Sequence, residues 1–231
     1  MAARAHKARP MGIQVKICGI NSLEAADAAI RGGADFVGLN FHAASPRFLK
    51  PDLARLLAER TRGRIQLVAL LCDPTDDAIA ETVRLVRPDM LQLHGNEPPE
   101  RVAAIRSRFG IEILKAVAIA DSSDFLRVPA YEAVADRLLF DAKAPERATR
   151  PGGHGSAFDW QLLRGRTFSR PWLLAGGLTP ENVERAIVTS GASAVDASSG
   201  VETSPGIKSA ALIAEFTANA KAAQFARETR A

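Results

Sequence analysis

The chain has 231 residues, 47% of them hydrophobic and 24% charged, and a formal net charge of +4 at pH 7. These proportions are typical of a globular protein that buries a full core without disulfides, and they exclude a disordered chain. No apolar run is long enough to span a bilayer, so we do not expect a membrane protein. The basic residues form no clustered stripe in the body of the chain, so nucleic-acid binding is not expected either.

Short apolar runs alternate with helical patterns throughout, an arrangement typical of βαβ units and a parallel sheet. Eight strands are predicted, at 15–17, 36–40, 66–71, 90–93, 112–117, 137–140, 172–175 and 194–197. Helices are predicted after residue 22, after residue 179, and at 51–60, 76–86, 98–109, 159–163 and 209–224.

Two of the helix starts carry clear capping signals. Asn21-Ser22-Leu23-Glu24 offers an N-cap with a carboxylate three residues on, and alanines at helical spacing follow it up to a Gly32-Gly33 stop. Thr179-Pro180-Glu181 combines a capping hydroxyl with a proline suited to a first helical turn. Both signals therefore predict the helical half of a βα unit.

Eight β/α units of this length close most economically as a single-domain (β/α)₈ TIM barrel of the α/β class. A doubly wound open sheet is the alternative, but no glycine fingerprint for a dinucleotide follows the first strand. In such a barrel the loops after the strands carry function, and the loops before them carry stability. We therefore search the ends of the strands for reactive groups.

No linker divides the chain, so we expect one domain over residues 13–224. Residues 1–12 have no hydrophobic period and are expected to form a disordered or extended arm, and 225–231 a C-terminal tail. Cys18 and Cys72 are the only cysteines, and no signal peptide is recognisable. Free thiols and a cytoplasmic location are therefore expected.

Two proton-transfer groups end different strands in the same way. Cys18 closes the first strand and Asp141 the sixth, so both are predicted to face each other across the barrel mouth. A thiolate can act as a base, and a carboxyl in a half-apolar setting keeps the proton that a general acid needs. The alternatives are an inert packed thiol and a carboxylate that caps a loop or pairs with Lys143. Asp196, which ends the eighth strand, is predicted to lie close to Cys18.

Glycine-rich stretches recur late in the chain, and two of them follow the seventh and eighth strands. Barrels bind phosphate at this place through backbone N–H groups. The stretches predict a phosphorylated ligand held by Gly153, Gly155, Gly176, Gly177, Ser198, Ser199 and Gly200.

Two further residues are candidates for binding a substrate. Arg47 follows the second strand and can hold a carboxylate through two parallel contacts, although an exposed arginine after a turn explains it equally well. His94 ends the fourth strand and is either a donor to the ligand or a structural histidine. No cluster has metal-ligand spacing, so a metal is not expected.

These motifs, taken in order, resemble the phosphoribosylanthranilate isomerase family. The resemblance runs from about residue 15 to residue 221 and rests on Lys16-Ile17-Cys18-Gly19, Ser45-Pro46-Arg47, Leu91-Gln92-Leu93-His94-Gly95, Phe140-Asp141, Gly152-Gly153-His154-Gly155, Leu174-Ala175-Gly176-Gly177-Leu178 and Asp196-Ala197-Ser198-Ser199-Gly200-Val201-Glu202. The chain departs from the family pattern at His154, where threonine is usual, and at Ala43-Ala44, where proline and lysine are common.

The resemblance implies a cofactor-free Amadori rearrangement in tryptophan biosynthesis, from N-(5-phosphoribosyl)anthranilate to 1-(2-carboxyphenylamino)-1-deoxyribulose 5-phosphate. It implies that Asp141 protonates the furanose ring oxygen and that Cys18 removes the proton at C2. It also implies that Arg47 holds the anthranilate carboxylate and that His94 and Asp196 line the pocket. The oligomeric state is left open between a monomer and a homodimer.

Two other functions remain compatible with the same scaffold. A sugar-phosphate epimerase or another isomerase would share the phosphate loops, but such enzymes typically recruit carboxylates, histidines and a metal rather than a thiol. A non-catalytic phosphate-binding barrel would explain the glycines and leave Cys18 opposite Asp141 without a purpose.

Overall fold

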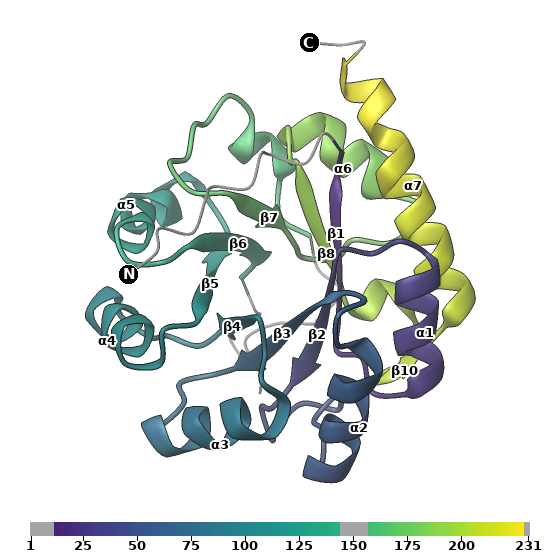
Figure 1. The fold of residues 1–231 in the computed structure, drawn as a ribbon. Coiled ribbons are helices and arrows are strands. Elements are labelled where there is room, and N and C mark those ends of the chain that lie inside the picture. Colours follow the sequence, from purple (N-terminus) through teal and green to yellow (C-terminus); the bar gives the residue numbers. More distant parts are fainter. Residues whose placement is uncertain (1–11, 144–156, 229–231) are drawn as a thin grey trace.

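Eight parallel strands close into a barrel in the computed structural model, which describes residues 12–143 and 157–228 (Figure 1). The strands are β1 (Gln14–Cys18), β2 (Phe36–Asn40), β3 (Gln66–Leu71), β4 (Met90–Leu93), β5 (Glu112–Ile119), β6 (Arg137–Ala142), β7 (Trp172–Leu174) and β8 (Ala194–Ala197). They pair in sequence order, and β1 closes the barrel against β8 with Lys16 opposite Asp196. The predicted barrel is confirmed, and the open sheet is excluded.

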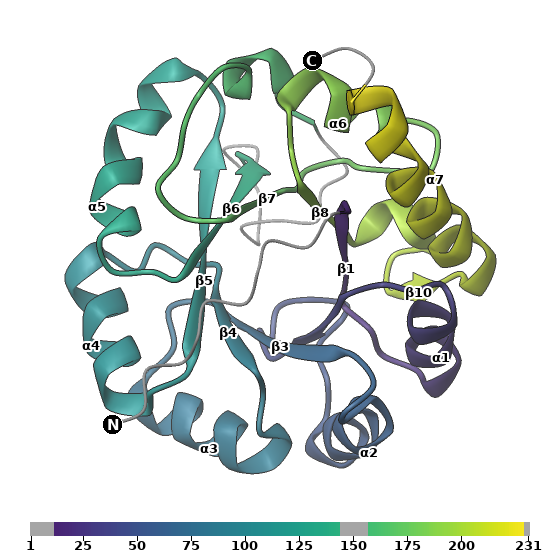
Figure 2. The ribbon, with the colours of Figure 1, turned by 45° about the horizontal axis from the view of Figure 1, so that its top comes forward.

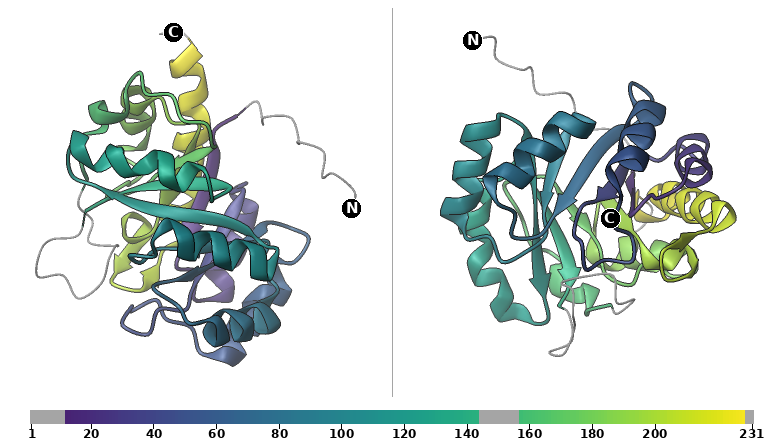
Figure 3. Two further views of the ribbon diagram at one scale, coloured as in Figure 1. Left: turned by 90° about the vertical axis from the view of Figure 1, so that its left-hand side faces the viewer. Right: turned by 90° about the horizontal axis from the view of Figure 1, so that it is seen from below.

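Helices surround the barrel on its outside (Figures 2 and 3). The α-helices are α1 (Leu23–Arg31), α2 (Pro51–Thr61), α3 (Asp76–Val86), α4 (Pro99–Phe109), α5 (Val128–Glu132), α6 (Val183–Ser190) and α7 (Ala210–Glu228). Short 3₁₀ helices are η1 (Ser122–Arg127), η2 (Trp160–Leu163) and η3 (Ser199–Val201), and β9 (Glu202–Ser204) pairs with β10 (Ile207–Lys208) in a hairpin. The last helix, α7, packs against both α6 and α1, so it covers the seam where the barrel closes. No helix among the described residues has the length and apolarity needed to cross a membrane.

Most predicted boundaries lie within two residues of the observed ones, and three helices differ in start, type or length. The helix predicted after residue 179 begins only at Val183, because the N–H of Thr179 donates to Asn182 Oδ1 at 2.9 Å and residues 180–182 form a turn. The helix predicted at 159–163 is the 3₁₀ helix η2, and the last helix extends to Glu228. The elements η1, α5, β9 and β10 were not predicted.

The interior of the barrel has one polar contact at the bottom, an apolar layer above it and further polar side chains at the top. Near the bottom, the Arg137 guanidinium lies 5.5 Å from the centre of the Phe36 ring and donates to Gln14 Oε1. An apolar layer follows, formed by Val68, Met90, Leu114, Ala116, Leu139, Leu173, Ala175 and Ala194 together with the Phe36 ring. The apolar layer therefore separates this contact from the polar side chains at the carboxyl ends of the strands.

Candidate active site

The predicted acid, base and pocket residues lie at the same end of the barrel. Cys18 is the last residue of β1, Asp141 lies one residue from the end of β6, and Asp196 one residue from the end of β8. His94 directly follows β4. Because all eight strands are parallel, these side chains share the mouth formed by the strands' carboxyl ends.

Asp141 is buried, and both of its carboxylate oxygens are engaged. Oδ1 accepts the N–H of Ala142 at 2.9 Å, and Oδ2 lies 3.1 Å from His94 Nε2. Gly176 has a φ of +87°, and a Cβ at this position would lie 2.7 Å from the Ala142 nitrogen and 3.1 Å from Asp141 Oδ1. Gly176 therefore lets the loop after β7 approach the Asp141 carboxyl closely.

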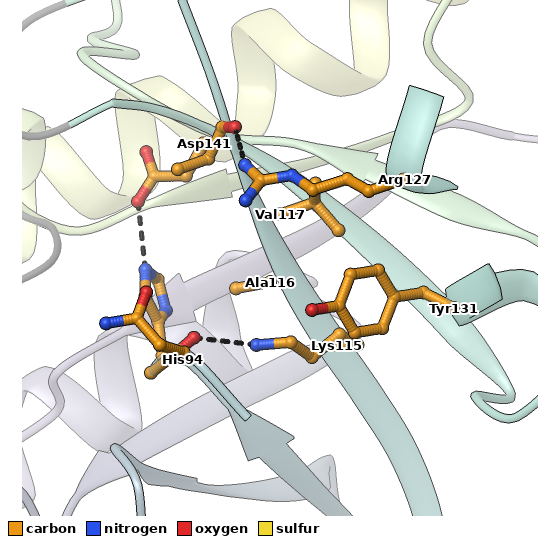
Figure 4. A pocket seen from close by; sticks show the side chains of 10 residues that line it. His94, Lys115, Ala116, Val117, Arg127, Tyr131 and Asp141 are labelled. Carbon is orange, nitrogen blue, oxygen red and sulfur yellow. Dashed lines mark hydrogen bonds and ion pairs between the residues drawn. The ribbon is translucent and has the colours of Figure 1, made fainter. Parts of the chain in front are cut away.

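A cavity of about 240 Å³ opens beside Asp141 and His94 (Figure 4). Arg127 from η1 reaches its rim, where it donates a hydrogen bond to the carbonyl of Ala118. On its lower side, Lys115 Nζ donates to the carbonyl of Gly95 at 2.8 Å. Lys115 also forms an ion pair of 2.7 Å with the buried Glu97, so its charge is balanced within the protein. The cavity therefore combines the Asp141 carboxyl with the Arg127 guanidinium, which suits a polar ligand.

Lys16 lies directly beneath Cys18 on the inner face of β1 and is completely buried. Its Nζ donates to Asp196 Oδ1 at 2.9 Å. A Cβ at position 38 would lie 2.9 Å from Cys18 Sγ and 3.3 Å from Lys16 Nζ, so Gly38 provides the space that the thiol and the ammonium share. The ammonium therefore stands between a carboxylate and a thiol.

Burial and the neighbouring charges shift the pKa values of Lys16, Cys18 and Asp196 in opposite directions. Burial raises the pKa of the Cys18 thiol, and the nearby Lys16 ammonium only partly offsets that effect. Burial by itself would lower the pKa of Lys16, but the Asp196 carboxylate and Cys18 outweigh burial and raise it. Burial also raises the pKa of Asp196 against the opposing effect of Lys16. In the free protein Lys16 is therefore charged, and Cys18 keeps its proton at neutral pH.

Arg47 is buried and is held by a carboxylate that the sequence analysis gave no role. Its Nε and Nη2 donate to the two carboxylate oxygens of Glu202, each at 2.7 Å. Gly19 has a φ of +77°, and a Cβ at this position would overlap the Arg47 side chain. The aliphatic part of the Arg47 side chain therefore lies immediately beside the residue that follows Cys18.

The hairpin of β9 and β10 ties this arginine to the loop after β8. Lys208 Nζ donates to Glu202 Oε1 at 2.7 Å and to the carbonyl of Ser198 at 2.8 Å. Burial lowers the pKa of Lys208 to about 8, although Glu202 acts in the opposite direction. Glu202 thus joins two cations from separate loops, a contact between residues 155 positions apart that no local sequence pattern indicates.

The loops after β7 and β8 lie against each other. A Cβ on Gly200 would overlap the carbonyl of Leu178, and Asn182 Nδ2 donates to the carbonyl of Gly177 at 2.8 Å. No described residue accepts a hydrogen bond from the backbone N–H of Ser199 or of Gly200. These two N–H groups lie at the start of η3 and are available to donate hydrogen bonds to an anion.

Some of the predicted phosphate loop lies outside the described residues, namely Gly153 and Gly155, together with His154. Among the residues that the structure does describe, no group of three or more histidine, cysteine, aspartate or glutamate side chains could hold a metal ion. The remaining predicted residues are all found at the mouth of the barrel or in the loops above it.

A parallel barrel with a carboxyl, an imidazole and a thiol at its mouth, and with N–H donors after β8 that no described residue accepts, defines a (β/α)₈ enzyme of the proton-transfer class. The comparisons with known proteins narrow this class. Residues 15–219 match the family model described as N-(5'-phosphoribosyl)anthranilate (PRA) isomerase. The chain belongs to this family, and the resemblance stated from its motifs is confirmed.

Relatives and solved structures agree with this assignment. The N-(5'-phosphoribosyl)anthranilate isomerase of Rhodospirillum centenum is 51% identical over 213 residues, which cover 92% of this chain and 100% of the relative. The crystal structure of the Thermotoga maritima phosphoribosyl anthranilate isomerase superposes with a TM-score of 0.82 at 38% identity and covers 91% of this chain and 99% of its own. A further structure, at 35% identity, TM-score 0.78 and the same coverage, is a complex with reduced 1-(o-carboxyphenylamino)-1-deoxyribulose 5-phosphate.

Proposed function

We propose that this protein isomerises N-(5'-phosphoribosyl)anthranilate by an Amadori rearrangement, with Asp141 as the general acid and Cys18 as the general base. The observation that carries the proposal is the placement of these two side chains on separate strands, β6 and β1, at the mouth of one closed barrel. A substrate lying across the mouth can give and receive protons at two different atoms only if the two groups stand apart.

The first step is ring opening. Asp141 gives its proton to the furanose ring oxygen, the bond from this oxygen to C1 breaks, and the nitrogen lone pair forms a protonated C=N bond at C1. The N–H groups of Ala142 and His94 beside the Asp141 oxygens stabilise the carboxylate that remains, provided that His94 carries its proton on Nε2.

The second step is the removal of the proton at C2. Cys18 acts here as the thiolate, so its thiol proton must first pass to solvent. The sulfur then takes the proton from C2, the C–H electrons form the C1=C2 bond of an enolamine, and the nitrogen becomes neutral. Tautomerisation then places a proton on C1 and leaves the ketone at C2. The Lys16 ammonium below Cys18 supports this role, because it lowers the cost of a thiolate in a buried site.

The rest of the site positions the two ends of the substrate. Arg47 is assigned to the anthranilate carboxylate, which its guanidinium can meet while Glu202 holds its other edge. Asp196 and His94 line the sugar pocket. The phosphate is assigned to the backbone of Gly176, Gly177, Ser198, Ser199, Gly200, Gly153 and Gly155, and the open N–H groups at Ser199 and Gly200 support this assignment.

The test uses the loss of anthranilate-type fluorescence when purified protein meets freshly generated substrate. Cys18→Ser and Asp141→Asn should each lower kcat by several orders of magnitude, since each removes one proton-transfer group. Both should still bind the reduced product analogue. Cys72→Ser is the matched control, because Cys72 also follows a strand, and it should turn over normally. Near-normal rates in both site variants would overturn the mechanism, and no turnover in the parent would leave a non-catalytic phosphate-binding barrel.

The proposal includes a small phosphorylated substrate as the partner and a cytoplasmic location. Both cysteines are free thiols, which suits a reducing compartment. One solved relative from Thermotoga maritima is described as dimeric, with monomers derived from it. A monomer and a homodimer are thus both open to this chain, and sedimentation would distinguish them.

A further inference from the structure

Gln92, His94 and Asp141 form a chain of hydrogen bonds that runs from the barrel interior to the proposed acid. Gln92 and His94 are two residues apart on β4 and its end, so both face inward. The amide Nε2 of Gln92 lies 2.7 Å from His94 Nδ1, and His94 Nε2 lies 3.1 Å from Asp141 Oδ2. Figure 4 shows the His94 ring and the Asp141 carboxylate pointing toward each other in the lining of the cavity.

An amide nitrogen can donate a hydrogen bond but cannot accept one, so the ring atom that faces it must carry a lone pair. His94 Nδ1 is therefore unprotonated, and a neutral His94 carries its proton on Nε2. The Nε2–H then points at Asp141 Oδ2 and donates to it. The position of one proton at the active site is thus set by a residue that does not touch the cavity.

The burial of Gln92 fixes which way its amide is turned. Gln92 is fully buried, and its Oε1 accepts no hydrogen bond from any described residue. In this orientation the Gln92 carbonyl oxygen and one of its N–H groups lack a partner. Turning the amide over would instead leave both N–H groups without an acceptor. An orphaned buried N–H is rarer in proteins than an under-satisfied carbonyl oxygen, so the orientation with Nε2 toward His94 is favoured.

We propose that Gln92 is a positioning residue that holds His94 in the Nε2–H tautomer and thereby keeps the proton of Asp141 available to the substrate. This inference rests on the proposed role of Asp141 as the acid. In the opposite tautomer, His94 Nε2 would present a lone pair to Asp141 Oδ2 and accept its O–H. The imidazole would then compete with the substrate oxygen for the proton that must be transferred, and it could not stabilise the carboxylate afterwards.

The tautomer can be read directly by nitrogen-15 NMR of the imidazole in the ligand-free protein. The parent should show a pyridine-like Nδ1 and a pyrrole-like Nε2 for His94, assigned by the loss of these signals in His94→Gln. Asp141→Asn should keep this pattern, because the tautomer is set from the Gln92 side. A protonated Nδ1 in the parent would overturn the proposal whether or not the protein turns over substrate.

The variant Gln92→Glu tests the consequence for catalysis. Its carboxylate accepts a hydrogen bond and should move the His94 proton to Nδ1, with kcat reduced on the order of 100-fold and KM little changed. Gln92→Met, which has neither donor nor acceptor, should lose the fixed tautomer with a smaller fall in kcat. Gln66→Glu, at an exposed glutamine that begins β3, is the matched control and should change neither. A shifted tautomer in Gln92→Glu with kcat within twofold of the parent would overturn the proposal.

The two proposals fail separately. If the parent lacks turnover but shows the Nε2–H tautomer in a Gln92-dependent way, the proposed function fails and the positioning by Gln92 stands. If Gln92→Glu does not fold, as judged by its circular dichroism, the tautomer in the parent and in Gln92→Met still decides the matter.

Discussion

Glu202 and Arg47 are joined by two parallel hydrogen bonds of 2.7 Å, and neither side chain is accessible to water to any large extent. The Glu202 carboxylate also forms an ion pair with Lys208, so this one buried anion balances the charges of two buried cations, Arg47 and Lys208. Since the pair links the loop after β2 to the hairpin after β8, it fixes where the Arg47 guanidinium stands at the edge of the site. This geometry leads to the first prediction.

Glu202→Gln should raise KM by about tenfold or more and lower kcat much less, because a charge-assisted hydrogen bond that orients Arg47 contributes roughly 1.5–3 kcal/mol. Steady-state kinetics over a range of substrate concentrations separate the two constants. Glu215→Gln on the exposed face of α7 is the control and should be neutral. An unchanged KM in Glu202→Gln would show that Arg47 does not depend on this carboxylate.

Gly38→Ala should lower kcat by about ten- to hundredfold, since displacing a reacting group by about 1 Å has an effect of that size. The new Cβ would lie 2.9 Å from Cys18 Sγ, so the thiol must move. Gly33→Ala is the control, because its φ of +79° makes the substitution strained while no atom lies within 4 Å. The control should lose thermal stability and keep kcat. Equal kcat values in both variants would contradict the close fit around Cys18.

Lys208 should make stability depend on alkaline pH. Its pKa in the folded protein is about 8, below the value of an unfolded lysine, so between pH 8 and about 10.5 the unfolded chain binds the extra proton. The free energy of unfolding of the parent, measured relative to Lys208→Met, should therefore rise across this window by roughly 2 to 3 kcal/mol. Below pH 8 the difference should be flat.

Urea unfolding at several pH values provides this measurement. Lys50→Met, at an exposed lysine before α2, should show no such trend relative to the parent. A difference between the parent and Lys208→Met that falls as pH rises would mean that the ion pair with Glu202 outweighs burial.

The two thiols should react slowly with iodoacetamide in the folded, ligand-free protein at pH 8. Burial raises the pKa of Cys72 to about 12 and also raises the pKa of Cys18, so little thiolate is present at either position. Mass spectrometry after timed alkylation distinguishes the two sites, and protein unfolded in guanidinium provides the fast reference. Rapid alkylation of Cys18 in the folded protein would show that the Lys16 ammonium outweighs burial and that the base is already deprotonated.

Much of the fold could be predicted because each β/α unit is encoded locally. Apolar runs bounded by turn residues gave the bounds of β2, β3, β4 and β8, and the helical pattern at 76–86 gave those of α3. The start of α6 could not be predicted from Thr179 and Pro180, because the Asn182 side chain captures the Thr179 N–H and delays the helix by a turn. The hairpin after β8 is too short and too polar to show a strand period.

The residues at the strand ends could be predicted as candidates, but their partners could not. Strand alternation indicated that Cys18, Asp141 and Asp196 share the barrel mouth. It did not indicate that Lys16, which lies opposite Asp196 in the register of β1 and β8, pairs with that carboxylate, nor that Glu202 holds Arg47. These contacts join residues 180 and 155 positions apart, and their existence depends on the register of the closed barrel rather than on any local pattern.

The hydrogen bond from Lys16 to Asp196 also crosses the seam between the first and last strands of the barrel. Contacts that span so much chain form late in folding, because the entropy of closing the loop must be overcome first. A nascent chain that has emerged only as far as β7 already carries Cys18 and Asp141, yet the ammonium beside the thiol still lacks its carboxylate. Turnover therefore requires that β8 has closed the barrel. During refolding, the recovery of activity should lag behind the recovery of helix content.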